Sequence, residues 1–153
     1  MSQQRVPIAS VAAGVGNAFG WVGLRGEVFV VQGRLSVLAG TGVVPIGHGA
    51  CCNRLPVPVA GSVRYYVGRQ QHRVFLDASW SVLHIESADA FADPYWGPIT
   101  NFSYGPGLSL GYSFMSTTGL TVTVGAGLGR ESYGVTPVAQ LGIGWTWWRH
   151  HPS

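Results

Sequence analysis

Lysine is absent from this sequence of 153 residues, and charged residues of every kind are scarce. Charged side chains make up 10% of the chain, less than half of the roughly 25% that is usual for soluble domains. Such a chain is too apolar for an ordinary soluble domain and too sparsely charged for a disordered one. The basic residues are all arginines that stand singly along the sequence, so we expect no nucleic-acid binding.

Long hydrophobic runs are also missing. The long stretch 102–129 carries no charge, but it holds seven glycines, a proline and polar residues at alternate positions, and is therefore a poor spanning helix. Residues 1–20 contain one arginine and many small residues, a pattern that fits a strand better than a cleaved signal peptide. A secretion signal is then expected to lie outside this sequence.

Cysteine is nearly absent, and the sequence indicates no metal ion or cofactor. Cys51 and Cys52 are adjacent and form only a strained ring with each other, so free thiols or an intermolecular bridge are expected. The stretch "GHGACCN" offers His48 beside them without a fourth ligand at suitable spacing, which makes a poor metal site. Asp89 and Asp93 either contact a cation bound to lipopolysaccharide or are solvated loop acids.

The feature that is present almost everywhere is alternation with a period of two residues. In "GWVGLRGEVFV", residues 20–30, the aliphatic side chains fall on one face and Arg25 and Glu27 on the other. At this length the chain is expected to form a single domain, 1–153. We expect eight strands at approximately 6–17, 19–31, 34–45, 57–68, 73–85, 102–114, 120–129 and 136–148.

Two architectures fit eight alternating strands, a soluble sandwich or lipocalin-like barrel and a transmembrane barrel. The positions of the charges favour the second. Most charges fall in expected turns, loops or tails, and the four in mid-strand share the non-aliphatic face: Arg25, Glu27, Arg64 and Asp77. We therefore predict an all-β, eight-stranded antiparallel up-and-down transmembrane β-barrel, with aliphatic residues facing lipid and small polar residues filling the interior.

The connections and aromatic residues fit this architecture. Short turns are expected near 31–34, 69–72 and 115–119, and longer connections near 45–57, 85–101 and 129–135. This alternation is typical of periplasmic turns and outer loops. Aromatic girdles are expected at the strand ends, from Phe19, Trp21, Trp145, Trp147 and Trp148.

The mid-strand charges are expected to form a closed plug. If 69–72 is a tight turn, Arg64 lies directly opposite Asp77, close enough for a cross-strand ion pair. Small residues between Arg64 and Arg25 leave space for Arg64 to reach toward Glu27. The positive charges of the two arginines then cancel the negative charges of the two acids. An interior with little water requires this, because an uncompensated buried charge is costly.

The last expected strand carries a resemblance. In "QLGIGWTW", residues 140–147, Gln140, Gly142, Trp145 and Trp147 occupy the places of the C-terminal assembly signal of bacterial outer-membrane barrels. The whole chain resembles the small eight-stranded members of that group, the OmpA-like membrane domains and OmpX-like proteins. The resemblance implies a bacterial outer-membrane location, contact with outer-membrane lipid and lipopolysaccharide, and insertion by the barrel-assembly machinery. It names no protein partner.

This architecture hosts several functions, and the sequence favours one without catalysis. We expect a structural or surface-interaction barrel with a plugged polar lumen and no wide pore. The alternatives are a lipid-modifying enzyme, an acyltransferase or deacylase, and a narrow ion-conducting pore. For the enzyme, only "LHIESAD" groups a base and a nucleophile, His84 with Glu86 and Ser87, and it lacks the spacing of the lipid A deacylase barrels. If this cluster is not catalytic, His84 is expected to lie in the girdle at the membrane interface, followed by a polar loop.

Overall fold

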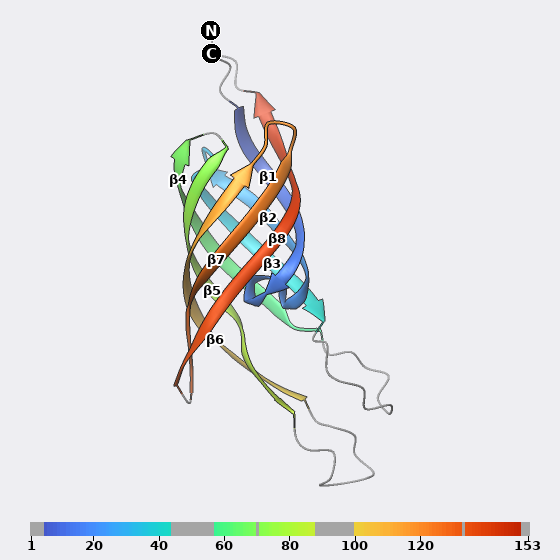
Figure 1. Ribbon diagram of the computed structural model, residues 1–153, viewed down its shortest axis with the longest axis vertical. Coiled ribbons are helices and arrows are strands. Elements are labelled where there is room, and N and C mark those ends of the chain that lie inside the picture. The colour runs from blue at the N-terminus through green and yellow to red at the C-terminus, as the bar shows by residue number, and fades with distance from the viewer. Residues whose placement is uncertain (1–4, 44–56, 70, 88–99, 133, 151–153) are drawn as a thin grey trace.

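Eight antiparallel strands close into a barrel in chain order, with β1 paired to both β2 and β8 (Figure 1). The computed structural model describes residues 5–43, 57–69, 71–87, 100–132 and 134–150. The strands are β1 (Arg5–Gly16), β2 (Trp21–Val31), β3 (Leu35–Val43), β4 (Val59–Arg69), β5 (His72–Ser87), β6 (Thr100–Met115), β7 (Leu120–Glu131) and β8 (Gly134–His150). The predicted eight-stranded antiparallel barrel is thereby confirmed. No helix in the described part of the chain is long and apolar enough to cross a membrane.

The two faces of each strand differ in the way the alternation predicts. On β2, Leu24 and Val28 point outward and are exposed, whereas Arg25 and Glu27 between them point inward and are buried. The same alternation continues on β7, where Thr121 and Thr123 are buried and Val124 is exposed. The barrel therefore has an aliphatic exterior and a polar, small-residue interior.

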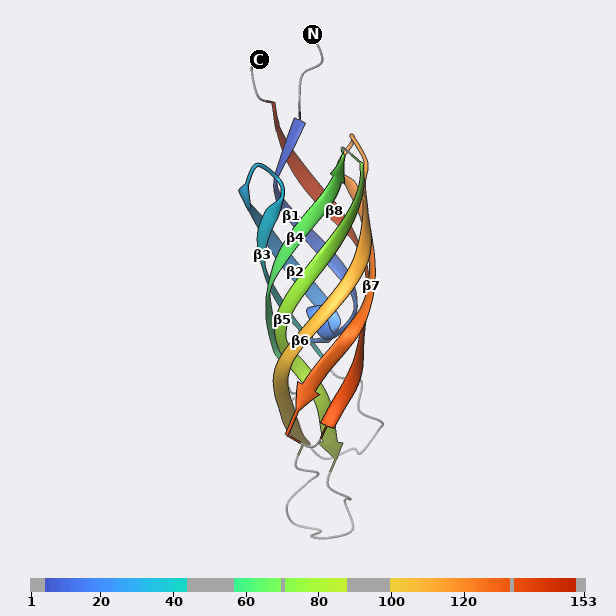
Figure 2. The same cartoon turned by 90° about the vertical axis from the view of Figure 1, so that its left-hand side faces the viewer.

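The start of β1, the end of β8 and the hairpins β2–β3, β4–β5 and β6–β7 gather at one end, which we call the short-turn end (Figures 1 and 2). The ends of β3 and β5 that precede the segments 44–56 and 88–99 lie at the opposite end. The expected longer connection at 129–135 is wrong. The β7–β8 ladder continues to the pair Glu131 and Gly134, which leaves a tight hairpin.

The expected second strand from residue 19 is also wrong at its beginning. Residues Asn17–Phe19 form a short 3-10 helix, η1, and β2 starts at Trp21. Gly16 and Gly20 flank η1 with φ angles of 109° and 59°, which residues with side chains rarely adopt. The chain therefore turns inward between β1 and β2 instead of continuing the ladder, and Phe19 is 0% exposed rather than part of a girdle.

Two further side chains lie on the face opposite to the expected one. A β-bulge between Val82 and His84 shifts the alternation of β5, so Val82, which shares the aliphatic face of its strand in the sequence pattern, is 1% exposed. Trp148 follows the buried Thr146 by two residues on β8 and packs against the interior cluster, whereas the sequence predicts it in a girdle. Trp145 and Trp147, at odd positions, are exposed outside.

Candidate functional site

The interior of the barrel brings the four predicted mid-strand charges together. Arg25 and Glu27 come from β2, Arg64 from β4 and Asp77 from β5, and all four side chains are buried. Each stands at an inward position because it alternates with outward aliphatic residues. The β4–β5 register pairs Arg64 with Asp77, as predicted from the tight turn that joins these strands.

Arg64 and Asp77 form the tightest ion pair of the interior. Nη2 and Nε of Arg64 both donate to Oδ2 of Asp77, at 2.5 and 3.0 Å. The guanidinium also lies over the ring of Phe75, with its Cζ 3.8 Å from the ring centroid. Arg64 is thus removed from water on all sides, and its charge is compensated by a carboxylate on one side and an aromatic face on another.

Glu27 is held mainly by hydroxyl groups. Its Oε1 accepts hydrogen bonds from Ser36 Oγ at 2.6 Å and from the Tyr66 hydroxyl at 2.7 Å, and its Oε2 accepts one from Ser10 Oγ at 3.1 Å. Arg25 Nη2 stands 4.0 Å from Oε2, at the limit of an ion pair. Three hydroxyl groups therefore donate hydrogen bonds to this buried carboxylate and replace the water molecules that would otherwise solvate it.

Tyr66 joins the two halves of the network. Its hydroxyl donates to Glu27 and accepts from Arg64 Nη1 at 3.4 Å. From the sequence, Arg64 is expected to reach toward Glu27; in the structure the connection runs through the Tyr66 hydroxyl. Tyr66 follows Arg64 by two residues, so the alternation of the strand by itself places Tyr66 on the inner face.

Gln140 is the second link. Its amide oxygen accepts from Arg25 Nη1 at 3.1 Å and from Arg64 Nη2 at 2.8 Å, and its Nε2 donates to Ser109 Oγ at 3.3 Å. The sequence motif predicts Gln140 as part of an assembly signal, whereas the structure also makes it the group shared by both arginines. Its signal in the sequence is that it is a long polar side chain among the small and apolar residues that share its face of β8, from Val138 to Gly144.

Two polar atoms of the network have no hydrogen-bond partner among the described residues. They are Asp77 Oδ1 and Arg25 Nε, both fully buried. Arg25 compensates in part through the ring of Phe19, whose centroid lies 4.8 Å from its Cζ. The network of four charges is therefore balanced but not saturated in hydrogen bonds, and the interior also holds a fifth buried charge, Arg73, which donates to the Gly33 carbonyl at 2.6 Å.

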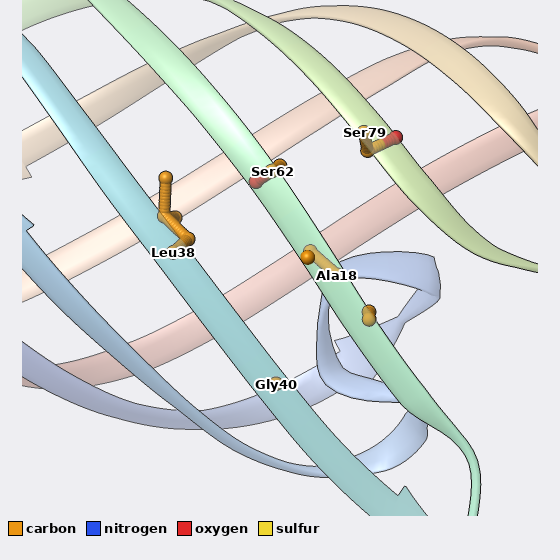
Figure 3. A pocket seen from close by; sticks show the side chains of 7 residues that line it. Ala18, Leu38, Gly40, Ser62 and Ser79 are labelled. Atoms are coloured by element: carbon orange, nitrogen blue, oxygen red, sulfur yellow. The ribbon is translucent and has the colours of Figure 1, made fainter.

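The 3-10 helix η1 sits inside the barrel at the end opposite the short turns. Asn17 Nδ2 donates to the Val82 carbonyl at 2.8 Å, next to the bulge of β5, and Asn17 Oδ1 accepts from the Ala139 amide at 3.3 Å. Between Ala18 of η1 and Leu38, Ser62 and Ser79 of the wall lies a pocket (Figure 3) of about 10 Å³, room for about one water molecule.

The remaining residues of the 140–147 motif serve different faces. Gly142 faces inward, and a Cβ atom there would collide with the ring of Phe19, so this glycine is needed for η1 to pack. Trp145 and Trp147 are exposed outward at 46% and 47%. Their part in assembly stays a prediction.

The other candidate residues form no described centre. His84 is exposed on the outer side of β5; Glu86 and Ser87 continue that strand, but their side chains lie outside the described residues. The same holds for the sequence candidates of the connecting segments, His48, Cys51, Cys52, Asp89 and Asp93. Within the described ranges, no group of three or more His, Cys, Asp or Glu side chains gathers as metal ligands.

Comparison of the chain with protein-family models and with curated protein sequences finds no match.

Proposed function

We propose that the protein is an integral outer-membrane barrel of a Gram-negative bacterium, with a structural or surface-interaction role, a plugged lumen and no catalytic activity. The observation that carries this proposal is the reversed polarity of the barrel. Buried ionic and polar side chains fill the inside, while the outside is aliphatic. Its partners are outer-membrane lipid, lipopolysaccharide and, during insertion, the barrel-assembly machinery.

The exterior supports the membrane setting. Leu24, Val28, Leu110 and Ile143 are among many exposed aliphatic residues that surround the barrel, an area far beyond the few hundred Å² of a typical apolar surface patch. On β5 the outward His72 and Trp80 are eight residues apart. We take these two side chains as the limits of the apolar outer face of β5. At about 3.3 Å per residue and a tilt of roughly 40°, they are separated by about 20 Å along the barrel axis, which is close to the height of the apolar band in known barrels.

The interior supports the plug. Arg25, Arg64, Glu27 and Asp77 sum to no net charge, and large side chains that include Phe19, Phe75 and Met115 are fully buried around them. Opening a wide pore would separate these pairs or expose the aromatic cluster. An uncompensated buried charge costs several kcal/mol, so the closed arrangement is the stable one.

The experiment is to refold the full chain into lipid vesicles and compare boiled with unboiled samples by gel electrophoresis in SDS, then to record currents in planar bilayers. We expect a heat-dependent shift in mobility, because a closed barrel resists SDS until heated, and no steady conductance. A chain that stays monomeric in water without detergent contradicts the membrane setting. Steady ion conduction by an inserted barrel contradicts the plug and favours the narrow pore.

A further inference from the structure

The charges outside the interior network are unevenly distributed between the two ends of the barrel. Arg5, Arg34 and Arg149 are exposed at the short-turn end, and Arg69 is the last residue of β4 at the same end. We call the three exposed arginines, Arg5, Arg34 and Arg149, the basic rim. Among the described residues, every acidic residue lies elsewhere: Glu27 and Asp77 in the interior, Glu86 and Glu131 toward the opposite end.

The basic rim lies directly beyond aromatic residues. On the outer face of β8, alternate residues run from Ile143 through Trp145 and Trp147 to Arg149, and all are exposed. This order of aliphatic, aromatic and cationic side chains matches the order of hydrocarbon, interface and phosphate in a lipid leaflet.

Arg5 and Arg149 lie near the ends of the neighbouring strands β1 and β8, on opposite faces of the ladder. The β1–β8 register pairs Arg149 with Val6, so Arg149 points outward and Arg5, the next residue on β1, points toward the mouth of the barrel. Arg5 Nη1 donates to the Thr117 carbonyl at 3.1 Å, which ties the side chain to the β6–β7 turn and leaves other guanidinium donors for a ligand. A guanidinium fits phosphate in a bidentate manner.

We propose that the basic rim binds the phosphate groups of anionic glycerophospholipids in the leaflet that meets the short-turn end. This inference rests on the proposed membrane function. The alternation of short and long connections predicts that the short turns face the periplasm, so the rim would meet phospholipid rather than lipopolysaccharide. The ligand chemistry is a lipid phosphate monoanion such as that of phosphatidylglycerol.

The test measures quenching of tryptophan fluorescence by lipids with brominated acyl chains, since Trp145 and Trp147 are exposed beside Arg149. The full chain is refolded into phosphatidylcholine vesicles that contain either brominated phosphatidylglycerol or brominated phosphatidylcholine. We expect phosphatidylglycerol to be preferred about fivefold at low salt, the ratio expected for one arginine at an anionic surface. The preference should weaken in high salt because of screening.

The variant combines Arg5→Gln, Arg34→Gln and Arg149→Gln, and should lose most of the preference. The matched control is Arg130→Gln, an exposed arginine toward the opposite end, which should keep it. A preference that persists in the triple variant, or that is absent in the inserted full chain, overturns the inference. If dilute inorganic phosphate abolishes the preference, the rim binds free phosphate and the inference is likewise overturned. Failure to insert into either vesicle overturns the proposed function instead.

Discussion

Gln140 shows how one neutral side chain holds several charged ones in place. Its amide oxygen receives a hydrogen bond from each of two arginines that belong to different strands, Arg25 and Arg64. A carboxylate there would add a third negative charge to a network whose two arginines and two acids already cancel. A neutral acceptor takes one hydrogen bond from each guanidinium group and preserves that balance.

Replacing Gln140 with methionine should destabilise the barrel by about 1–3 kcal/mol. Methionine has a similar shape but removes the acceptor of Arg25 Nη1 and one of the two acceptors of Arg64 Nη2, which keeps its bond to Asp77. Urea unfolding from lipid vesicles measures the effect. The matched control is Gln32→Met, at an exposed position of the β2–β3 turn, which should change stability little. Equal losses in both variants would show that the shared acceptor contributes nothing.

The ion pair of Arg64 and Asp77 gives a second prediction. Asp77→Ala should cost about 3–5 kcal/mol because it leaves Arg64 buried and uncompensated. Replacing Arg64 with methionine and Asp77 with leucine together should cost far less than the sum of the single changes, since no lone charge remains. Urea unfolding from lipid vesicles gives the free energy of unfolding of the single and double variants, which are then compared. A double variant as unstable as the two single variants combined would refute the coupling.

Among the elements, η1 and the bulge of β5 depend on each other. The bulge turns Val82 inward, and Asn17 of η1 donates to the Val82 carbonyl. Gly142 leaves the space that Phe19 fills. A β-bulge commonly re-aims a side chain or a carbonyl at a functional position. Here it supplies the attachment for the helix that fills one end of the barrel.

Asn17→Ala should release η1 from both walls. The change removes the hydrogen bonds to the Val82 carbonyl and from the Ala139 amide, and we expect a loss of about 1–3 kcal/mol. Unfolding in urea gives the stability, with Ser132→Ala at the exposed β7–β8 turn as the control. Planar bilayers add a second readout, because a loosened η1 should produce brief openings. Unchanged stability would mean that η1 is held by packing alone.

The whole molecule is organised from the outside inward by polarity. Its exposed surface is aliphatic over most of the strand length, and its ionic groups are shared among strands that are distant in sequence. In water this surface would drive association of barrels. In the proposed bilayer the same surface is solvated by lipid, and the closed ladder leaves no strand edge unpaired.

A matched pair of Val→Arg substitutions tests this organisation. Val124 is exposed midway along β7, and Val135 is exposed near the start of β8, beside the β7–β8 hairpin. Val124→Arg should cost about 2–4 kcal/mol because it places a charge near the bilayer midplane, and Val135→Arg about 0–1 kcal/mol because it lies nearer the interface. Refolding and urea unfolding in vesicles give both values. Equal costs would contradict the proposed depth of the two positions.

The positions of the strands, the two faces of each strand and the register of β4 with β5 follow from patterns within short stretches of the sequence. Outward Leu24 and inward Arg25 are adjacent in sequence, so alternation alone assigns their sides. The pairing of Arg64 with Asp77 follows from the tight turn between β4 and β5, because a short hairpin sets the register of its strands. Closure of eight such strands is the arrangement that leaves no edge.

Contacts across the interior depended on the tertiary structure. Gln140 meets Arg25 from 115 positions away, and this contact exists only because closure of the barrel brings β8 and β2 around the same narrow space. The inward turn of η1 and the burial of Val82 have the same origin, since each depends on the room left by glycines and walls of other strands. Alternation assigns a side chain to a face, whereas its partner on that face is set by the curvature and stagger of the closed barrel.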